Sequence, residues 1–332
     1  MSARARLLAC LLPLALAGPA CDIGISAGGF EGTFDRTLTV SGPLDLQVSS
    51  GSGNISVRTG PDGAVQVHAR VRASGGPWAS LSGRSAEERI REIERNPPIV
   101  QEGNRIEIGP KRGNDGWNGI SVSYEIVVPA NARVEARSGS GDLEVADVAG
   151  PVEVSTGSGD INVGRITDDV TARTGSGDIE LAGAASARTS TGSGSVIASA
   201  VRGDFDARTG SGDIIVRQEG KGSLEVSTGS GNIELTGATG PLHVRASSGD
   251  IRLEGTPTSD WDVSASSGSV RLHLPSSKSG FDLDLRSSSG RIESAIPITT
   301  TGSQSRRELR GAVRGGGPRV HVSTSSGGIV VQ

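Results

Sequence analysis

Gly157-Ser158-Gly159-Asp160-Ile161 is the stretch of this 332-residue chain that decides its fold, because closely similar phrases recur along most of its length. The residue after the last glycine of each copy stands at 142, 160, 178, 195, 213, 232, 250, 269 and 291, and an earlier copy is Gly51-Ser52-Gly53-Asn54-Ile55. The steps in the regular series are 18, 18, 17, 18, 19, 18, 19 and 22 residues. A nearly constant period of this length indicates a stacked repeat architecture.

One repeat contains two short strands and two turns. Val152 and Val154 alternate with polar residues and share one face of a strand, and Ile161 and Val163 do the same after the turn. The turn glycines can adopt the positive φ that a tight reversal requires. A Gly- and Asp-rich corner over residues 164–169 leads to the next copy. A single repeat has too little apolar surface to fold alone, so neighbouring repeats must stack to bury it.

Stacking places the inward residues of successive repeats in continuous columns. With strands about 4.8 Å apart, nine rungs form a rod of roughly 40 Å. A narrow interior suits Val, Ile and Leu, which agrees with a chain that has 4 Phe, 3 Trp and 1 Tyr. Trp261 and Phe281 occupy inward positions late in the array, where we expect them to fill a wider end. The predicted core column consists of Leu143, Val145, Val152, Val154, Ile161, Val163, Val170, Ile179, Leu181, Ile214, Val216, Leu224, Val226, Ile233, Leu235, Leu242, Val244, Ile251 and Leu253.

The sequence therefore predicts an all-β chain whose fold is a β-solenoid (β-helix), with about 18 residues and two short strands in each rung. A β-sandwich is the main alternative, because hairpins with glycine turns also give regular spacing. A sandwich, however, does not require the same turn residues at a fixed interval.

The repeated turn residues are expected to be structural, because Asp and Asn side chains can hydrogen-bond to the backbone of their own turn. Asp also suggests calcium, which needs six to eight oxygen ligands from neighbouring rungs. Ser195 and Arg291 replace Asp in other copies, so we predict no metal site and keep a calcium-stabilised surface protein as an alternative. The predicted structural turn residues are Gly139, Gly141, Asp142, Gly157, Gly159, Asp160, Gly175, Gly177, Asp178, Gly210, Gly212, Asp213, Gly229, Gly231 and Asn232.

The first 20 residues resemble a bacterial lipoprotein signal peptide. Arg4 and Arg6 precede an apolar run over residues 7–17, which is too short to span a bilayer. Small residues then lead to Cys21, which we predict to be the lipid-modified first residue of the exported chain. Cys10 would be lost with the leader, so no internal disulfide could form. Two or more acyl chains on this cysteine would anchor the protein stably in a membrane. The alternative to lipidation is ordinary secretion.

The rest of the chain divides into three predicted parts. Residues 21–36 are expected to form a flexible tether, and residues 37–132 an N-terminal β portion. Residues 133–332 are expected to form the regular solenoid, with a loop over 296–318 before closing strands at 320–323 and 329–331.

One short capping helix is predicted over residues 85–96. Ser85 and Glu88 form a capping-box pattern, and Pro97 ends the helix. Ala86, Ile90 and Ile93 share one face, with which we expect the helix to cover the open end of the first sheet.

The composition argues against nucleic-acid binding and against catalysis. The formal net charge is −4 and no basic stripe is present, so nucleic acid is not an expected partner. The arginines of the 296–318 loop are expected to be solvated. The four histidines are His68, His243, His273 and His321, and none has a metal-ligand spacing to another histidine or a thiol. We therefore predict no catalytic residues, no cofactor and no enzymatic activity, with a carbohydrate-active β-helix enzyme as an alternative.

Together, these features resemble a bacterial domain family of unknown function labelled putative adhesin, which is similar to the head domains of some autotransporter-type adhesins. The resemblance covers roughly residues 37–332 and rests on the Val-x-Val-x-Thr-Gly-Ser-Gly-Asp-Ile-x-Val rungs, the leader cysteine and the closing Ser325-Ser326-Gly327-Gly328-Ile329. It implies a β-solenoid at the cell envelope, periplasmic or on the outer surface, and no catalytic residues. We expect a non-enzymatic adhesin or scaffold that is held to the membrane by a lipid and binds a protein or glycan ligand.

Overall fold

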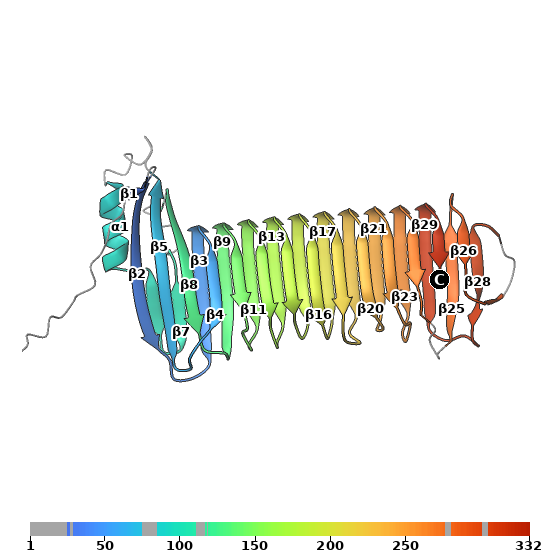
Figure 1. Ribbon diagram of the computed structural model, residues 1–332, viewed down its shortest axis with the longest axis horizontal. Helices are drawn as coiled ribbons and strands as arrows, with labels where there is room; N and C mark the ends of the chain where they lie inside the picture. Colours follow the sequence, from blue (N-terminus) through green and yellow to red (C-terminus); the bar gives the residue numbers. More distant parts are fainter. Residues whose placement is uncertain are drawn as a thin grey trace, which may run out of the picture.

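The computed structural model describes residues 25–26, 29–74, 85–110, 117, 119–275, 280–300 and 305–332. These residues form a long rod in which the strands lie across the axis and follow one another along it (Figure 1). They belong to two sheets, here named sheet A and sheet B, and the inward side chains of both sheets form one hydrophobic core. The predicted all-β solenoid is thereby confirmed.

Each regular rung contributes one strand to each sheet, and successive rungs pair in parallel. The strands of sheet B are β9 (Ala132–Ser140), β11 (Val152–Ser158), β13 (Val170–Ser176), β15 (Ala187–Ser193), β17 (Phe205–Ser211), β19 (Leu224–Ser230), β21 (Leu242–Ser248) and β23 (Trp261–Ser267). The strands of sheet A are β10 (Leu143–Ala146), β12 (Ile161–Arg165), β14 (Ile179–Gly183), β16 (Val196–Val201), β18 (Ile214–Gln218), β20 (Ile233–Ala238), β22 (Ile251–Gly255) and β24 (Val270–His273).

The alternation of apolar and polar residues explains which side chains lie inside. Every residue of the predicted core column is buried, as are Trp261 and Phe281. The core also contains a column at the second corner of the rung, which the sequence analysis did not identify. That column includes Val148, Ile166, Ala184, Val201 and Ala238.

At the N-terminal end, the regular stack begins earlier than residue 133. Strands β3 (Leu44–Ser52) and β4 (Ile55–Thr59) form a complete rung that pairs in parallel with β9 and β10. The upstream copy of the turn phrase is therefore part of the same series, although more than 70 residues separate β4 from β9.

Two segments, one before β3 and one between β4 and β9, extend the sheets beyond this first rung. Sheet A continues through β8 (Ile120–Val128), β5 (Ala64–Ser74), β2 (Gly29–Thr39) and β1 (Ile25–Ser26), and sheet B through β7 (Arg105–Ile108) and β6 (Ile99–Glu102). The predicted tether over 21–36 is wrong for residues 29–36, because they pair along β5 as a regular antiparallel strand.

Helix α1 (Ala86–Arg95) lies against β2 and β5 at this end of the rod (Figure 1). The capping box of Ser85 and Glu88 is confirmed, and Ala86, Ile90 and Ile93 are buried. The amide of Thr33 in β2 donates a hydrogen bond of 3.0 Å to Oε1 of Glu94. The helix thus covers part of an otherwise open strand edge, as predicted. Within the described residues, no helix is long and apolar enough to cross a membrane.

At the C-terminal end, the order in space differs from the order in the chain. Strands β29 (Arg319–Ser326) and β30 (Ile329–Val331) lie between the rung of β23 and β24 and the rung of β25 (Phe281–Ser287) and β26 (Ile292–Ser294). The predicted closing strands therefore do not close the end. They form the last rung but one, and β25 and β26 form the last rung. Parallel pairs on both sides of β29 hold it there.

The predicted loop over 296–318 is also wrong in part. Strands β27 (Thr299–Thr300) and β28 (Glu308–Val313) form an antiparallel pair that continues sheet B beyond β25. The run of Gly, Thr and Arg hid this strand because few of its residues are apolar.

Candidate functional site

The predicted turn residues lie together along one edge of the rod, where they form a seam. At the first glycine of these predicted turns, the neighbouring rung leaves no room for a side chain without a shift. A Cβ added to Gly157 would lie 2.5 Å from the carbonyl oxygen of Gly139, and one added to Gly175 would lie 2.5 Å from that of Gly157. Gly210 and Gly229 have the same environment. These glycines are therefore required by close stacking and not by their own φ.

The second glycine of each turn is required for two reasons. Its φ is positive, at 149° for Gly159 and 148° for Gly212, a conformation that residues with a Cβ rarely adopt. In addition, a Cβ at either position would overlap the carbonyl of the corresponding glycine one rung earlier.

The Asp and Asn residues of the seam form a ladder between rungs. Oδ1 of Asp142 accepts a hydrogen bond of 3.1 Å from the amide of Asp160, whose own Oδ1 accepts one of 2.9 Å from Asp178. The same bond links Asp213 to the amide of Asn232. The sequence analysis expected each side chain to bond within its own turn, but the acceptor serves the next turn along the rod.

A threonine that the sequence analysis did not single out completes the seam. The Thr174 hydroxyl donates a hydrogen bond of 3.0 Å to the carbonyl of Gly159, in the preceding rung. Thr156, Thr209 and Thr228 make the equivalent bond. These threonines are buried, and the bonds to the glycine carbonyls satisfy their hydroxyls. The recurrence of a hydroxyl residue, Thr or Ser, before each Gly-Ser-Gly was the available signal.

The seam is therefore occupied by contacts between rungs and offers no assembled reaction centre. In the described part of the chain, no group of three or more His, Cys, Asp or Glu residues is placed to hold a metal ion. The predicted lipidation site, Cys21, and the predicted leader over residues 1–20 lie outside the described residues.

The outer face of sheet B is an ordered polar surface. Two rows of outward side chains follow the rod axis in strict register from strand to strand. The first row runs through Glu135, Glu153, Thr171, Arg188, Asp206, Glu225, His243 and Asp262. The second row alternates arginine with serine: Arg137, Ser155, Arg173, Ser190, Arg208, Ser227, Arg245 and Ser264.

Ion pairs connect these two rows. Arg137 pairs with Glu135, and Arg208 lies 2.8 Å from both Asp206 and Glu225. The hydrogen bond that Arg208 donates to Glu225 raises the pKa of Arg208 above its ordinary value; burial opposes the shift and the Asp206 charge assists it. The face is consequently an array of oriented, neutralised charges at a regular spacing and not a strongly cationic or anionic surface.

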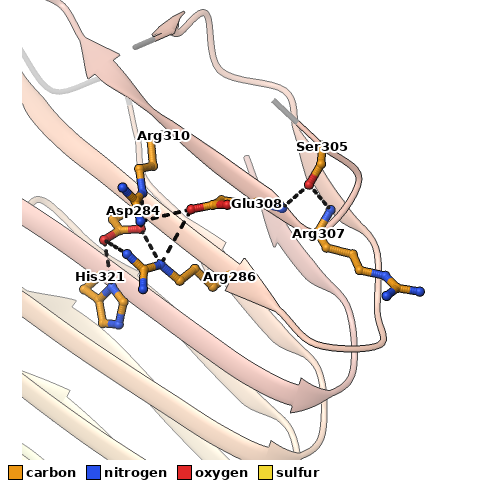
Figure 2. Close-up of polar contacts among 7 residues, drawn as sticks. All are labelled: Asp284, Arg286, Ser305, Arg307, Glu308, Arg310 and His321. Carbon is orange, nitrogen blue, oxygen red and sulfur yellow. Dashed lines mark hydrogen bonds and ion pairs between the residues drawn. The ribbon is translucent and has the colours of Figure 1, made fainter. Parts of the chain in front are cut away.

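A polar cluster stands where this face meets the C-terminal end (Figure 2). Asp284 of β25 accepts hydrogen bonds from Arg286 and, across the strand pair, from Arg310 of β28 at 3.2 Å. Nδ1 of His321 in β29 lies 3.4 Å from Asp284 Oδ2, at an angle that makes no hydrogen bond. Glu308 joins the cluster through Arg310 at 3.0 Å and Arg286 at 4.0 Å.

The cluster lowers the pKa of the Asp284 carboxyl group. Partial burial acts in the opposite direction, but it is outweighed by the hydrogen bond from Arg286 and by the charges of Arg286, His321 and Arg310. The sequence analysis missed this cluster because its members come from three strands that become neighbours only when β29 inserts beside β25.

The same insertion changes the environment of the histidines. His243 and His321 lie in one row with Asp262 between them and Asp284 beyond. The distance from His243 Nδ1 to Asp262 Oδ2 is 3.3 Å. From sequence alone these histidines stand singly, because 78 residues separate them.

The terminal rung also borders a pocket of about 540 Å³. It is lined by Ile292, Ser294, Ile296, Ile298, Ser305, Arg306 and Leu309. The pocket is wide open to solvent.

Comparison with known protein families identifies a family that the chain matches. Residues 85–221 and 167–332 match the profile of the family described as Toastrack DUF4097. No curated protein matches the chain.

Several solved structures are similar over 90% of the chain. A putative cell adhesion protein from Clostridium sporogenes is 12% identical, with 98% of its own chain covered and a TM-score of 0.19. A putative adhesin from Bacteroides fragilis is 12% identical, with 97% covered and a TM-score of 0.34. A putative lipid binding protein from Parabacteroides distasonis is 14% identical, with 96% covered and a TM-score of 0.44.

Proposed function

As the chain belongs to the Toastrack DUF4097 family, whose function is unknown, we propose that it is a non-enzymatic binding or scaffold module of the bacterial cell envelope. In this proposal the leader exports the chain, a lipid on Cys21 anchors it, and sheet B of the rod presents a surface to a protein or glycan ligand.

One observation carries the proposal: the two outward rows of sheet B stay in register over eight successive strands. At a rise of about 4.8 Å for each strand, the Arg side chains of the second row recur about every 10 Å. A ligand with several similar groups along its length could contact several rungs at once. Weak contacts of this kind add through avidity.

The absence of enzymatic activity is part of the same proposal. The polar groups of sheet B pair with one another along an exposed, flat face, whereas a catalytic site usually lies in a concave pocket with a few convergent polar groups. The seam carboxylates are likewise engaged by backbone amides of the next rung.

The anchor is tested by labelling growing cells with an alkyne fatty acid. We expect the wild-type chain to acquire the label and to sediment with membranes. Cys21→Ser should lose both properties, whereas Cys10→Ser, the matched control, should keep them. A wild-type chain that is released without label would show secretion and contradict the anchor.

The binding face is tested with a photo-crosslinking amino acid placed singly in cells. Ser155 and Ser227 lie outward on sheet B, and Arg70 on β5 is an exposed control position away from it. We expect one recurring adduct from the two sheet B positions and none from Arg70. The same adduct from all three positions, or none from sheet B, would contradict the proposed face.

A further inference from the structure

The outer face of sheet A carries an exposed apolar pair at its middle. Ile197 of β16 and Ile215 of β18 are direct register partners, with 41% and 42% of their surface exposed. Among the described residues only one other large hydrophobic side chain is comparably exposed, Val100 of β6 in sheet B, at 39%. The two isoleucines form a small apolar patch on a polar face, and the charges in line with it supply the second observation.

The residues in line with this pair have an ordered charge. From β10 to β24, the row of outward side chains is Glu144, Asn162, Glu180, Ile197, Ile215, Glu234, Arg252 and Arg271. The side of the pair toward the N-terminus is acidic, and the far end toward the C-terminus is basic. The two ends of the row, Glu144 and Arg271, are therefore complementary in charge.

We propose that sheet A is the contact surface for a second copy of this chain, with the two rods antiparallel. A two-fold axis parallel to the strands, between β16 and β18, sets Ile197 opposite Ile215 of the second copy. The same axis sets Glu144 opposite the second copy's Arg271 and Asn162 opposite its Arg252. Such an interface is self-complementary, as a symmetric dimer requires.

Charge distinguishes this arrangement from a parallel one. If the rods were parallel, every residue of the row would face itself, so that each charged residue would oppose a like charge: Glu144, Glu180, Glu234, Arg252 and Arg271. Like charges in contact disfavour an association. In the antiparallel arrangement the one unfavourable pair is Glu180 with Glu234, and the Arg252 guanidinium lies 3.6 Å from Glu234 in the same copy.

The size of the surface predicts a weak dimer. Eight strands at about 4.8 Å spacing, with about four residues each at about 3.3 Å, give an area of roughly 34 by 13 Å. This area is smaller than the roughly 800 Å² that each partner of a stable complex contributes. A high local concentration, as on a membrane, would favour its formation. The inference does not depend on the proposed anchor or on the ligand of sheet B.

Sedimentation velocity tests the surface. The full chain carries Cys10→Ser and Cys21→Ser, so that no disulfide links two copies. We expect a dimer fraction that rises with concentration and a dissociation constant at least tenfold higher in the double variant Ile197→Thr/Ile215→Thr. Thr preserves the β propensity of these strands. Val100→Thr, the matched control, should associate as the parent does.

A parent chain that stays monomeric up to about 1 mM, the range of the weakest specific contacts, would overturn the proposal, as would an equal loss of association in Val100→Thr. Unchanged circular dichroism and melting temperature in the double variant keep the comparison valid. If the circular dichroism or the melting temperature changes slightly, disulfide crosslinking between engineered cysteines still tests the same contact in a folded dimer.

Engineered cysteines test the antiparallel geometry. In the same background, chains with Ile197→Cys are mixed with chains with Ile215→Cys under mild oxidation. We expect disulfide dimers that join the two kinds of chain, at least tenfold faster than either kind joins itself. Preferred self-linkage of Ile197→Cys would indicate parallel rods and overturn the geometry. Glu144→Arg should weaken the dimer, and adding Arg271→Glu should restore it.

Discussion

Each residue of the phrase Thr-Gly-Ser-Gly-Asp has a contact with the rung beside it. Thr174 donates to a carbonyl, Gly175 and Gly177 leave space for backbone, and Asp178 accepts from an amide of the next rung. Because similar neighbours recur from rung to rung, the same phrase recurs over the middle rungs, whereas Ala246 and Ser247 replace its Thr and first Gly in a later copy. Stacking at this edge therefore explains the repeated phrase without any ligand.

The role of the first turn glycine predicts unequal effects of one substitution. Gly175→Ala places a Cβ 2.5 Å from the carbonyl oxygen of Gly157, so we expect a loss of about 1–3 kcal/mol in the free energy of unfolding. Gly51→Ala, at the same position of the phrase, meets nothing within 4 Å. Urea denaturation should show little change for Gly51→Ala. Equal losses in both variants would mean that φ preference, and not stacking, selects the glycine.

The buried threonines provide a second matched pair. Thr174→Val removes the donor to the Gly159 carbonyl and leaves that carbonyl unsatisfied, at a cost of about 1–3 kcal/mol. Thr189 is also buried, but its hydroxyl has no hydrogen-bond partner among the described residues. Thr189→Val should therefore be neutral or slightly stabilising by the same denaturation measurement. A larger loss in Thr189→Val than in Thr174→Val would refute the hydrogen-bond ladder.

The turns and the core could be predicted from the residues themselves. The hydrogen-bond and ion-pair partners of the polar side chains could not. The glycines and the alternation of Val152 and Val154 follow from local rules for turns and strands. The acceptor role of Asp142 toward Asp160 depends on the distance between two rungs, which no local pattern contains. The Asp284 cluster was missed for the same reason, because His321 becomes its neighbour only in the folded chain.

Among the elements, those with strong local signals were predictable and those placed by pairing alone were not. Helix α1 has its capping box and an apolar face, and it begins and ends as expected. Strand β28 has neither a clear alternation nor flanking turn phrases, so it was mistaken for a loop. Strand β29 lies between β23 and β25, so strands that follow one another in the sequence are not adjacent in the sheet here.

The polar cluster around Asp284, at the C-terminal end of sheet B, predicts that the stability of the fold depends on pH. The lowered pKa of Asp284 means that its ionised form stabilises the fold above the ordinary aspartate pKa of about 3.9, and that this contribution is lost as the pH falls below it. Asp284→Asn should therefore lower the melting temperature at pH 6, and the difference from wild type should shrink toward pH 3. Asp62→Asn, in an exposed turn at the other end, serves as the control. A difference that grows toward pH 3 would contradict the assignment.

At the scale of the whole molecule, the rod separates its surfaces by role. The seam edge holds the rungs together, sheet B presents its paired charges, and sheet A carries the isoleucine pair. Helix α1 covers one end, and the β27–β28 pair extends sheet B at the other. This division follows from one geometric fact, the parallel stacking of rungs in register.

Pulsed electron paramagnetic resonance tests that stacking most directly. A spin label at Ser155 in β11 is paired in turn with one at Ser264, Ser323 or Arg286, in a chain with Cys10→Ser and Cys21→Ser. These positions lie six, seven and eight strands away, so the expected distances are about 29, 34 and 38 Å at about 4.8 Å for each strand. The account predicts that Ser323 lies between Ser264 and Arg286. Distances that follow chain order instead, with Ser323 farthest, would contradict it.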